Sequence, residues 1–346
     1  MQRRSLVSVL MLLAGAVLPP VSHAAPPLTL RVLTHSSFDL PKEQLARFEK
    51  DTGVRLRLVK AGDAGEMTNK LILTKARPIA DVVFGIDNTL LPRAMAAGVI
   101  DPYTGPAAQR ATSAALDGGV VPVDHGYVNL NVDKAWFAKS GLALPASLDD
   151  LAKPAYAKLL VVQHPATSSP GMAFLLATIG GLGEDKAFAW WKAMRANGVK
   201  VVKGWTEAYY TEFTRNGGTR PIVVSYATSP AAEVFYSKEA LGESPTANLF
   251  LKGGVFRQIE SVALVRGGNP AAREAAGQFI EFLRSAPVQQ SLQTTMWMYP
   301  AEAGAARVDV IQRHAAEPAS HDSPPAADIL AKSKAWVQRW TQTVLK

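Results

Sequence analysis

"LTLRVLTHSSF" at residues 28–38 alternates apolar and other side chains before it turns polar, which predicts a β-strand that ends in a loop. Residues 41–53, "PKEQLARFEKDTG", follow with a proline at a helix start and a glycine at its end. A strand at 54–63, a helix at 66–76 and a strand at 79–87 continue the pattern. Strands and helices alternating at this spacing predict right-handed crossovers, a parallel sheet and the α/β class.

Polar side chains stand at the carboxyl ends of these three predicted strands. They are His35, Asp63 and Asp87. Ligands of open parallel sheets bind outside the carboxyl ends of the strands. We therefore expect all three side chains to line one edge of the first lobe.

The rest of the chain predicts a second α/β unit between two strand-like crossings. Residues 121–131, "VPVDHGYVNLN", form a strand-like run without a preceding helix, and residues 158–235 alternate strands and helices again. Residues 255–268 give another strand-like run before the chain returns to helices. Two lobes joined by two crossing strands are the simplest interpretation. The expected division is 25–125 and 263–346 for lobe 1, and 126–262 for lobe 2.

The first 24 residues have the pattern of a secretory signal peptide. Arg3 and Arg4 precede an apolar run, and Ser22 and Ala24 supply small residues before a cleavage site. The apolar run is shorter than the roughly 20 residues that cross a bilayer, so we expect no membrane insertion. The chain has no cysteine, which excludes disulfides and a lipid-modified cysteine. We expect a mature protein that is free in the periplasm.

Charge and motifs argue against several functions. The net charge of +8 is spread along the chain and no recognition helix or RNA motif occurs, so we expect no nucleic acid partner. "GGLGEDKAF" lacks the glycine spacing of a nucleotide loop, no HExxH is present, and Ser225 does not stand in a nucleophile elbow. His314 and His321 lie in a linker and are typical of solvated residues, so we expect no metal site. An exported phosphate-ester hydrolase stays open as an alternative.

Aromatic and small polar residues gather at four predicted junctions. Each lies at a strand end or a helix start, where a ligand between two lobes would be bound. They are Trp205 and Tyr209 in "KGWTEAYY", Tyr226 and Thr228 in "VSYATSPA", Ser168 and Ser169 in "HPATSSPGMAF", and Trp297 in "MWMYP". Aromatic faces, carboxylates and a helix N-terminus suit a small cationic aromatic ligand, with or without phosphate.

These motifs carry a resemblance. From Leu28 to Trp336 the chain resembles the periplasmic thiamine-binding proteins of ABC uptake systems. The similar segments, in order, are "ADVVFGIDN", "DHGYVNLNVDK", "TSSPGMAFLL", "VVKGWTEAYY", "VSYATSPAA" and "MWMYP". The resemblance implies a two-lobed periplasmic binding protein of the type II solute-binding fold. Such a receptor needs no cofactor, holds thiamine, its monophosphate or its diphosphate, and delivers it to an inner-membrane permease with a cytoplasmic ATPase.

The resemblance also implies roles for single residues. Trp205, Tyr226 and Trp297 match the aromatic walls, Asp63 the carboxylate near the cationic ligand, and Ser168 the phosphate pocket. Two positions at the site depart from the family pattern: His35 replaces a tyrosine, and Ala64 replaces the glycine after the aspartate. Asp87, Ser169, Tyr209 and Thr228 are further candidates.

Two other ligands fit the same fold. A ferric-ion receptor needs hard oxygen ligands, typically two tyrosines with a histidine or carboxylate. Tyr209 and Tyr210 are adjacent, and adjacent helical residues point about 100° apart, which disfavours a shared ion. A polyamine receptor would also use aromatic walls and acidic residues, although the expected phosphate pocket disfavours it.

Overall fold

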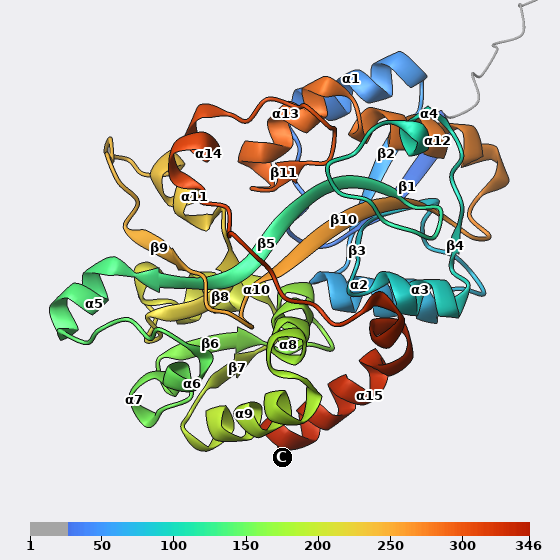
Figure 1. Ribbon diagram of the computed structural model, residues 1–346. Helices are drawn as coiled ribbons and strands as arrows, with labels where there is room; N and C mark the ends of the chain where they lie inside the picture. Colours follow the sequence, from blue (N-terminus) through green and yellow to red (C-terminus); the bar gives the residue numbers. More distant parts are fainter. Residues whose placement is uncertain (1–26) are drawn as a thin grey trace, which may run out of the picture.

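The computed structural model describes residues 27–346, so the expected signal peptide at residues 1–24 lies outside the described residues. One continuous sheet of 11 strands runs through both lobes, and helices pack against it (Figure 1). Eight strands follow the order β2-β1-β3-β10-β5-β8-β6-β7, while β9 and β11 pair with β5 and β4 pairs with β10. The strands are β1 (Thr29–Thr34), β2 (Arg55–Lys60), β3 (Val82–Asp87), β4 (Ile100–Asp101), β5 (Val121–Asp133), β6 (Leu160–Gln163), β7 (Lys200–Val202), β8 (Ile222–Tyr226), β9 (Thr246–Leu249), β10 (Phe256–Val265) and β11 (Tyr299–Pro300).

Helices cover the sheet in both lobes. Those before β6 are α1 (Lys42–Thr52), α2 (Ala64–Leu73), α3 (Leu91–Ala97), α4 (Pro106–Gln109), α5 (Lys134–Ser140), α6 (Leu148–Leu151) and α7 (Pro154–Ala157). Those after β6 are α8 (Ser169–Leu182), α9 (Glu184–Ala196), α10 (Trp205–Glu207), α11 (Ser229–Phe235), α12 (Arg273–Leu283), α13 (Ala286–Thr295), α14 (Asp309–His314) and α15 (Ala326–Val344). Among residues 27–346, no helix has the length and apolar character needed to cross a bilayer.

The first lobe confirms the predicted alternation. β1 pairs in parallel with β2 and with β3, and α1 lies between Pro41 and Gly53 as predicted. Gly53 ends the helix at φ 69°, a left-handed conformation that glycine adopts without steric cost. The predicted strand 54–63 is too long, because α2 begins at Ala64 and the Asp63 side chain accepts the Ala64 N–H as its cap.

The two predicted crossing strands are β5 and β10. They pair antiparallel with one another, and β10 also pairs with β3 while β5 pairs with β8. Nearly every residue of both strands is buried. The β5–β10 pair therefore connects the two lobes at the centre of the sheet.

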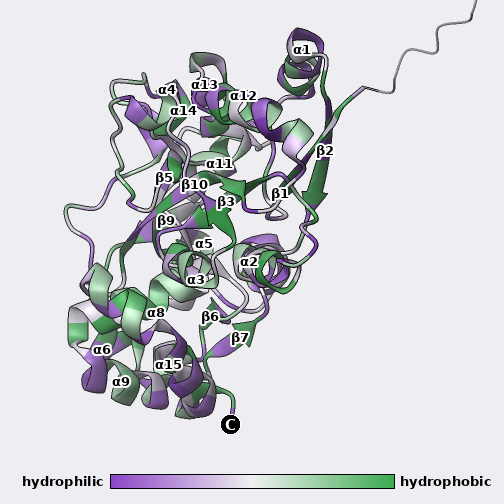
Figure 2. Ribbon diagram, turned by 90° about the vertical axis from the view of Figure 1, so that its right-hand side faces the viewer, coloured by the Kyte–Doolittle hydropathy of each residue, from purple (hydrophilic) through white to green (hydrophobic). Residues whose placement is uncertain are grey.

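Packing at the C-terminus differs from the expected division, whose boundaries otherwise stay a prediction. That division places residues 263–346 in lobe 1. However, Trp336 and Trp340 of α15 belong to the hydrophobic core that α8 and α9 form in lobe 2, and Figure 1 shows α15 beside α9. Hydrophobic and hydrophilic residues alternate along α15 (Figure 2), as expected for a helix with one face on a core. The last helix of the chain therefore packs on lobe 2.

Candidate functional site

A cavity of about 590 Å³ lies between the lobes. Both lobes and the crossing strand β10 line it, which is the arrangement that encloses a small molecule when two lobes meet. The cavity brings together these predicted residues: His35, Asp63, Ala64, Ser169, Trp205, Tyr209, Tyr226, Thr228 and Trp297.

Two predicted residues do not line the cavity. Ser168 is fully buried as the N-cap of α8, and its Oγ has no hydrogen-bond partner. Asp87 is also fully buried, and its Oδ1 accepts from Thr89 and from the Leu90 N–H, which fixes the turn into α3. Asp87 therefore has a structural role in the first lobe, and Ser168 stands one residue behind the cavity wall.

Three aromatic rings from lobe 2 form one wall of the cavity. Trp205 stacks on Tyr209 with ring centroids 5.1 Å apart, and the Tyr226 ring lies 6.5 Å from Trp205 at 62°. The Trp205 indole N–H donates to Ser225 at 2.9 Å, and the Tyr226 hydroxyl donates to Gln258 at 3.0 Å. These bonds hold the rings in fixed orientations, so they present preformed π faces to a ligand.

Trp297 holds an unusual backbone conformation. Its φ of 58° is the only positive value for a non-glycine residue between residues 27 and 346. Such a conformation costs on the order of 1–3 kcal/mol and persists only where surrounding contacts fix it. Here the Thr228 hydroxyl donates to the Trp297 carbonyl at 2.5 Å, and Phe235 and Tyr236 pack edge-on against the indole. Trp297 therefore joins the segment after α13 to α11.

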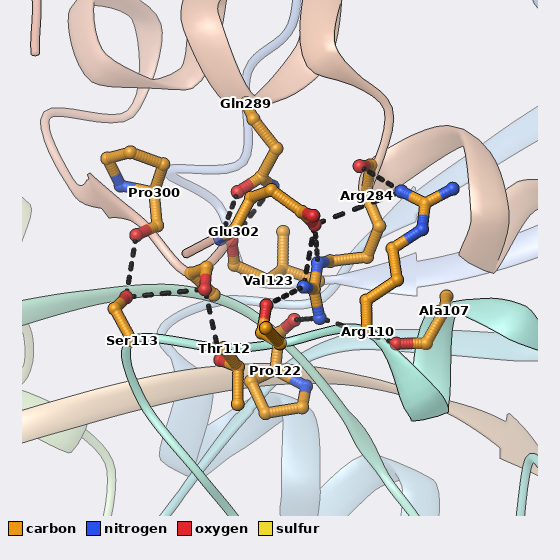
Figure 3. Close-up of polar contacts among 12 residues, drawn as sticks. Ala107, Arg110, Thr112, Ser113, Pro122, Val123, Arg284, Gln289, Pro300 and Glu302 are labelled. Carbon is orange, nitrogen blue, oxygen red and sulfur yellow. Dashed lines mark hydrogen bonds and ion pairs between the residues drawn. The ribbon is translucent and has the colours of Figure 1, made fainter. Parts of the chain in front are cut away.

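A polar network anchors the chain just after Trp297 (Figure 3). Arg284 is 1% exposed and donates to Glu302 at 2.7 Å and to the Pro122 carbonyl at 3.1 Å. Gln289 donates to the Val123 carbonyl at 2.9 Å and accepts the Glu302 N–H at 3.0 Å. The network ties the start of β5 to the Trp297 segment, so the position of the indole depends on the crossing strand.

Direct contacts between the lobes close one side of the cavity. The Asp63 carboxylate of lobe 1 accepts a hydrogen bond from the backbone N–H of Trp205 in lobe 2 at 3.0 Å. One turn along α2, the Glu66 N–H donates to the Thr167 carbonyl at 3.1 Å, and the Glu66 carboxylate pairs with Lys203 at 2.6 Å. These bonds form only when the lobes meet, so they stabilise the closed arrangement.

The cavity floor holds an acidic residue that was not predicted from the sequence. Glu260 of β10 lines the cavity, and its Oε1 lies 3.3 Å from His35 Nε2. Burial opposes protonation of His35, but Glu260, Asp63 and Asp87 together raise the pKa of the imidazole. A signal was present: the charge of Glu260 stands out in the mostly apolar strand "FRQIESVALV", two residues after Gln258.

Lobe 2 supplies further cavity residues that were missed, among them Tyr236 and Glu233. Glu233 lies on α11 about one turn after Ser229, so helical periodicity from the predicted helix start could have placed it at the cavity. Glu233 accepts from Tyr209 at 2.8 Å and from Arg215 at 3.0 Å. It therefore orients one ring of the aromatic wall.

The chain is also similar in sequence and structure to known proteins. Residues 43–319 match the sequence pattern of a family described as bacterial extracellular solute-binding protein. The chain belongs to this family. Curated relatives of this solute-binding protein include the thiamine-binding periplasmic protein of Escherichia coli (strain K12), 31% identical over 307 residues that cover 86% of each chain. The thiamine-binding periplasmic protein of Brucella suis biovar 1 (strain 1330) is 28% identical over 90% of this chain and 91% of that protein.

Solved structures agree with the predicted type II solute-binding fold. A periplasmic thiamin binding protein superposes with a TM-score of 0.80 at 28% identity, covering 95% of this solute-binding protein and 99% of that chain. The ferric binding protein from Campylobacter jejuni has a TM-score of 0.71 at 19% identity, covering 91% and 99%, so this likeness concerns the fold alone. The two-lobed α/β architecture is therefore confirmed.

Proposed function

We propose that this protein is an extracytoplasmic receptor that captures thiamine, or one of its phosphate esters, between its lobes. The observation that carries the proposal is the interlobe cavity, which the aromatic rings of Trp205, Tyr226 and Trp297 line together with acidic side chains. An aromatic cation with a flat ring matches such a cavity. The thiamine-binding relatives support the choice of ligand.

The aromatic wall supplies only part of the affinity. Each cation–π contact contributes roughly 0.5–2 kcal/mol, whereas nanomolar binding needs about −12 kcal/mol. The remainder comes from closure of the lobes, which excludes water and adds hydrogen bonds such as the one between Asp63 and Trp205. Ligand capture and closure are therefore one event.

A phosphate ester would place its anionic group at the start of α8. Ser169 lines the cavity there, at the N-terminus of a 14-residue helix, where free N–H groups and the helix dipole attract anions. Ser168, the N-cap of this helix, stands behind Ser169, and its Oγ accepts and donates no hydrogen bond. The receptor needs no cofactor, since the chemistry is reversible binding without a reaction.

The partner follows from the family. Extracellular solute-binding proteins deliver their ligand to a membrane transporter, and we propose an inner-membrane ABC permease with a cytoplasmic ATPase. The site of action is the periplasm, which the secretory pattern of residues 1–24 also favours. The protein is proposed to return its ligand unchanged and not to act as an enzyme.

Calorimetric titration of the mature, ligand-stripped protein with thiamine tests the proposal. We expect one-to-one binding with a submicromolar Kd. Parallel titrations with ferric citrate and spermidine, and a turnover assay on a phosphate ester, cover the rival functions. No heat with thiamine from folded, empty protein would refute the proposal, and submicromolar binding of a rival ligand instead would replace it.

A further inference from the structure

Three carboxylates line the cavity, and in two of them both oxygens accept hydrogen bonds from the protein. Asp63 accepts the N–H groups of Ala64 and Trp205 with its two oxygens, at 2.7 and 3.0 Å. Glu233 accepts from Tyr209 and Arg215 with its two oxygens. Each oxygen of these two carboxylates therefore already accepts one hydrogen bond from the protein.

The third carboxylate, Glu260, has open acceptor sites. Its side chain is only 7% exposed, yet it lines the cavity. Within residues 27–346, no backbone N–H or amide donates to it, and its side-chain contacts are His35 Nε2 at 3.3 Å and the carboxyl group of Asp124. A buried carboxylate is costly unless donors satisfy its oxygens. His35 and Asp124 occupy only part of the roughly four acceptor sites of the carboxylate, so a further donor is expected from the ligand.

The residues around Glu260 leave its carboxylate accessible from the cavity. Its partners in the strand register are Asp87 on β3 and Asp124 on β5, and neither lines the cavity. Burial raises the pKa of Asp124 well above its usual range, and the charge of Glu260 and a side-chain hydrogen bond to it raise this pKa further. His35 and Asp124 thus flank the carboxylate, and its remaining lone pairs face the ligand.

The ligand's own chemistry assigns the donor. The quaternary thiazolium nitrogen of thiamine carries no hydrogen, so it interacts with aromatic faces and cannot donate to a carboxylate. The amino group on the pyrimidine ring is a donor that needs an acceptor. We propose that Glu260 accepts a hydrogen bond from this amino group and thereby selects aminopyrimidine over oxopyrimidine ligands. The inference rests on the proposed function and adds Glu260 as the residue that recognises the pyrimidine ring.

Oxythiamine, which carries oxygen in place of the amino group, is the probe. The full mature chain is titrated with thiamine and with oxythiamine, for the wild type and for Glu260→Gln. We expect the wild type to bind thiamine about tenfold or more tightly than oxythiamine, because a charge-assisted hydrogen bond is lost and two acceptors face each other. In Glu260→Gln the amide can donate to the oxygen, so the ratio of the two affinities should shift by about tenfold toward oxythiamine.

Glu233→Gln is the matched control, since Glu233 lines the same cavity but both its oxygens are engaged. It should weaken both ligands alike and leave the affinity ratio within about twofold of the wild type. An unchanged ratio in folded Glu260→Gln, or an equal shift in Glu233→Gln, would overturn the inference. Should Glu260→Gln fail to fold, equal affinity of the wild type for the two ligands would overturn it. Absence of thiamine binding by the wild type would instead refute the proposed function itself.

Discussion

Gly65 offers a test in which stability and affinity are expected to change in opposite directions. It lies in the first turn of α2, where the lobes meet. A Cβ at this position would lie 2.5 Å from the Thr167 carbonyl carbon and 2.7 Å from its oxygen. Both atoms are backbone, so they cannot move aside as a flexible side chain would. Gly65→Ala should therefore keep the lobes apart without disturbing lobe 1.

The magnitude follows from the contacts that closure makes. Separation would lose the Glu66 N–H bond to Thr167 and the bond between Asp63 and Trp205, each worth about 0.5–1.5 kcal/mol. The exposed pair of Glu66 with Lys203 adds little. A loss of about 1–3 kcal/mol corresponds to roughly 5- to 150-fold weaker ligand binding. Alanine is about 1 kcal/mol more favourable than glycine within a helix, so the ligand-free protein should not lose stability.

Calorimetric titration with thiamine and thermal unfolding without ligand measure the two effects. Gly277→Ala is the matched control: Gly277 also lies within a helix, α12, and an added Cβ would meet only the Tyr103 ring at an ordinary 3.4 Å. This control should gain helix stability and keep its affinity. Wild-type affinity in Gly65→Ala would show that closure does not depend on this contact and would refute the reasoning.

Three further predictions test the indole, the buried network and the response to acid. Trp297→Ala should bind thiamine at least about tenfold more weakly while remaining folded, and an unchanged Kd in titration would remove the indole from the site. Arg284→Met should lower the free energy of unfolding in denaturant by about 3–5 kcal/mol, because Glu302 and buried carbonyls lose their donor; a loss below about 1 kcal/mol would contradict this. Burial, with Arg257 and Arg307 nearby, lowers the pKa of His125 to about 3. The unfolded chain therefore binds a proton that the folded chain does not, and stability should fall from about pH 6.5 downward by up to about 1.4 kcal/mol per pH unit. His125→Asn should flatten that slope in pH-dependent unfolding, and an unaltered slope would assign the effect to other groups.

The sequence by itself determined the α/β class and much of the cavity wall. Helices and strands follow from short-range periodicity and from end signals such as Pro41 and Gly53, which act over a few residues. Ligand-facing residues at strand ends follow from the same reasoning, because the carboxyl ends of parallel strands meet at one edge of a sheet. Trp205 and Tyr226 could thus be predicted as ligand-facing residues from the sequence.

The tertiary structure alone decided which partners those residues have. Asp63 accepts from Trp205, 142 positions away, and Thr228 fixes the strained Trp297, 69 positions away. Glu260 faces the cavity because of the register and the bulge between β5 and β10. Local periodicity gives the face on which a side chain stands, but it does not fix which distant segment that face meets. Those contacts depend on chain segments that pack only after the elements have formed, so they cannot be read from neighbouring residues.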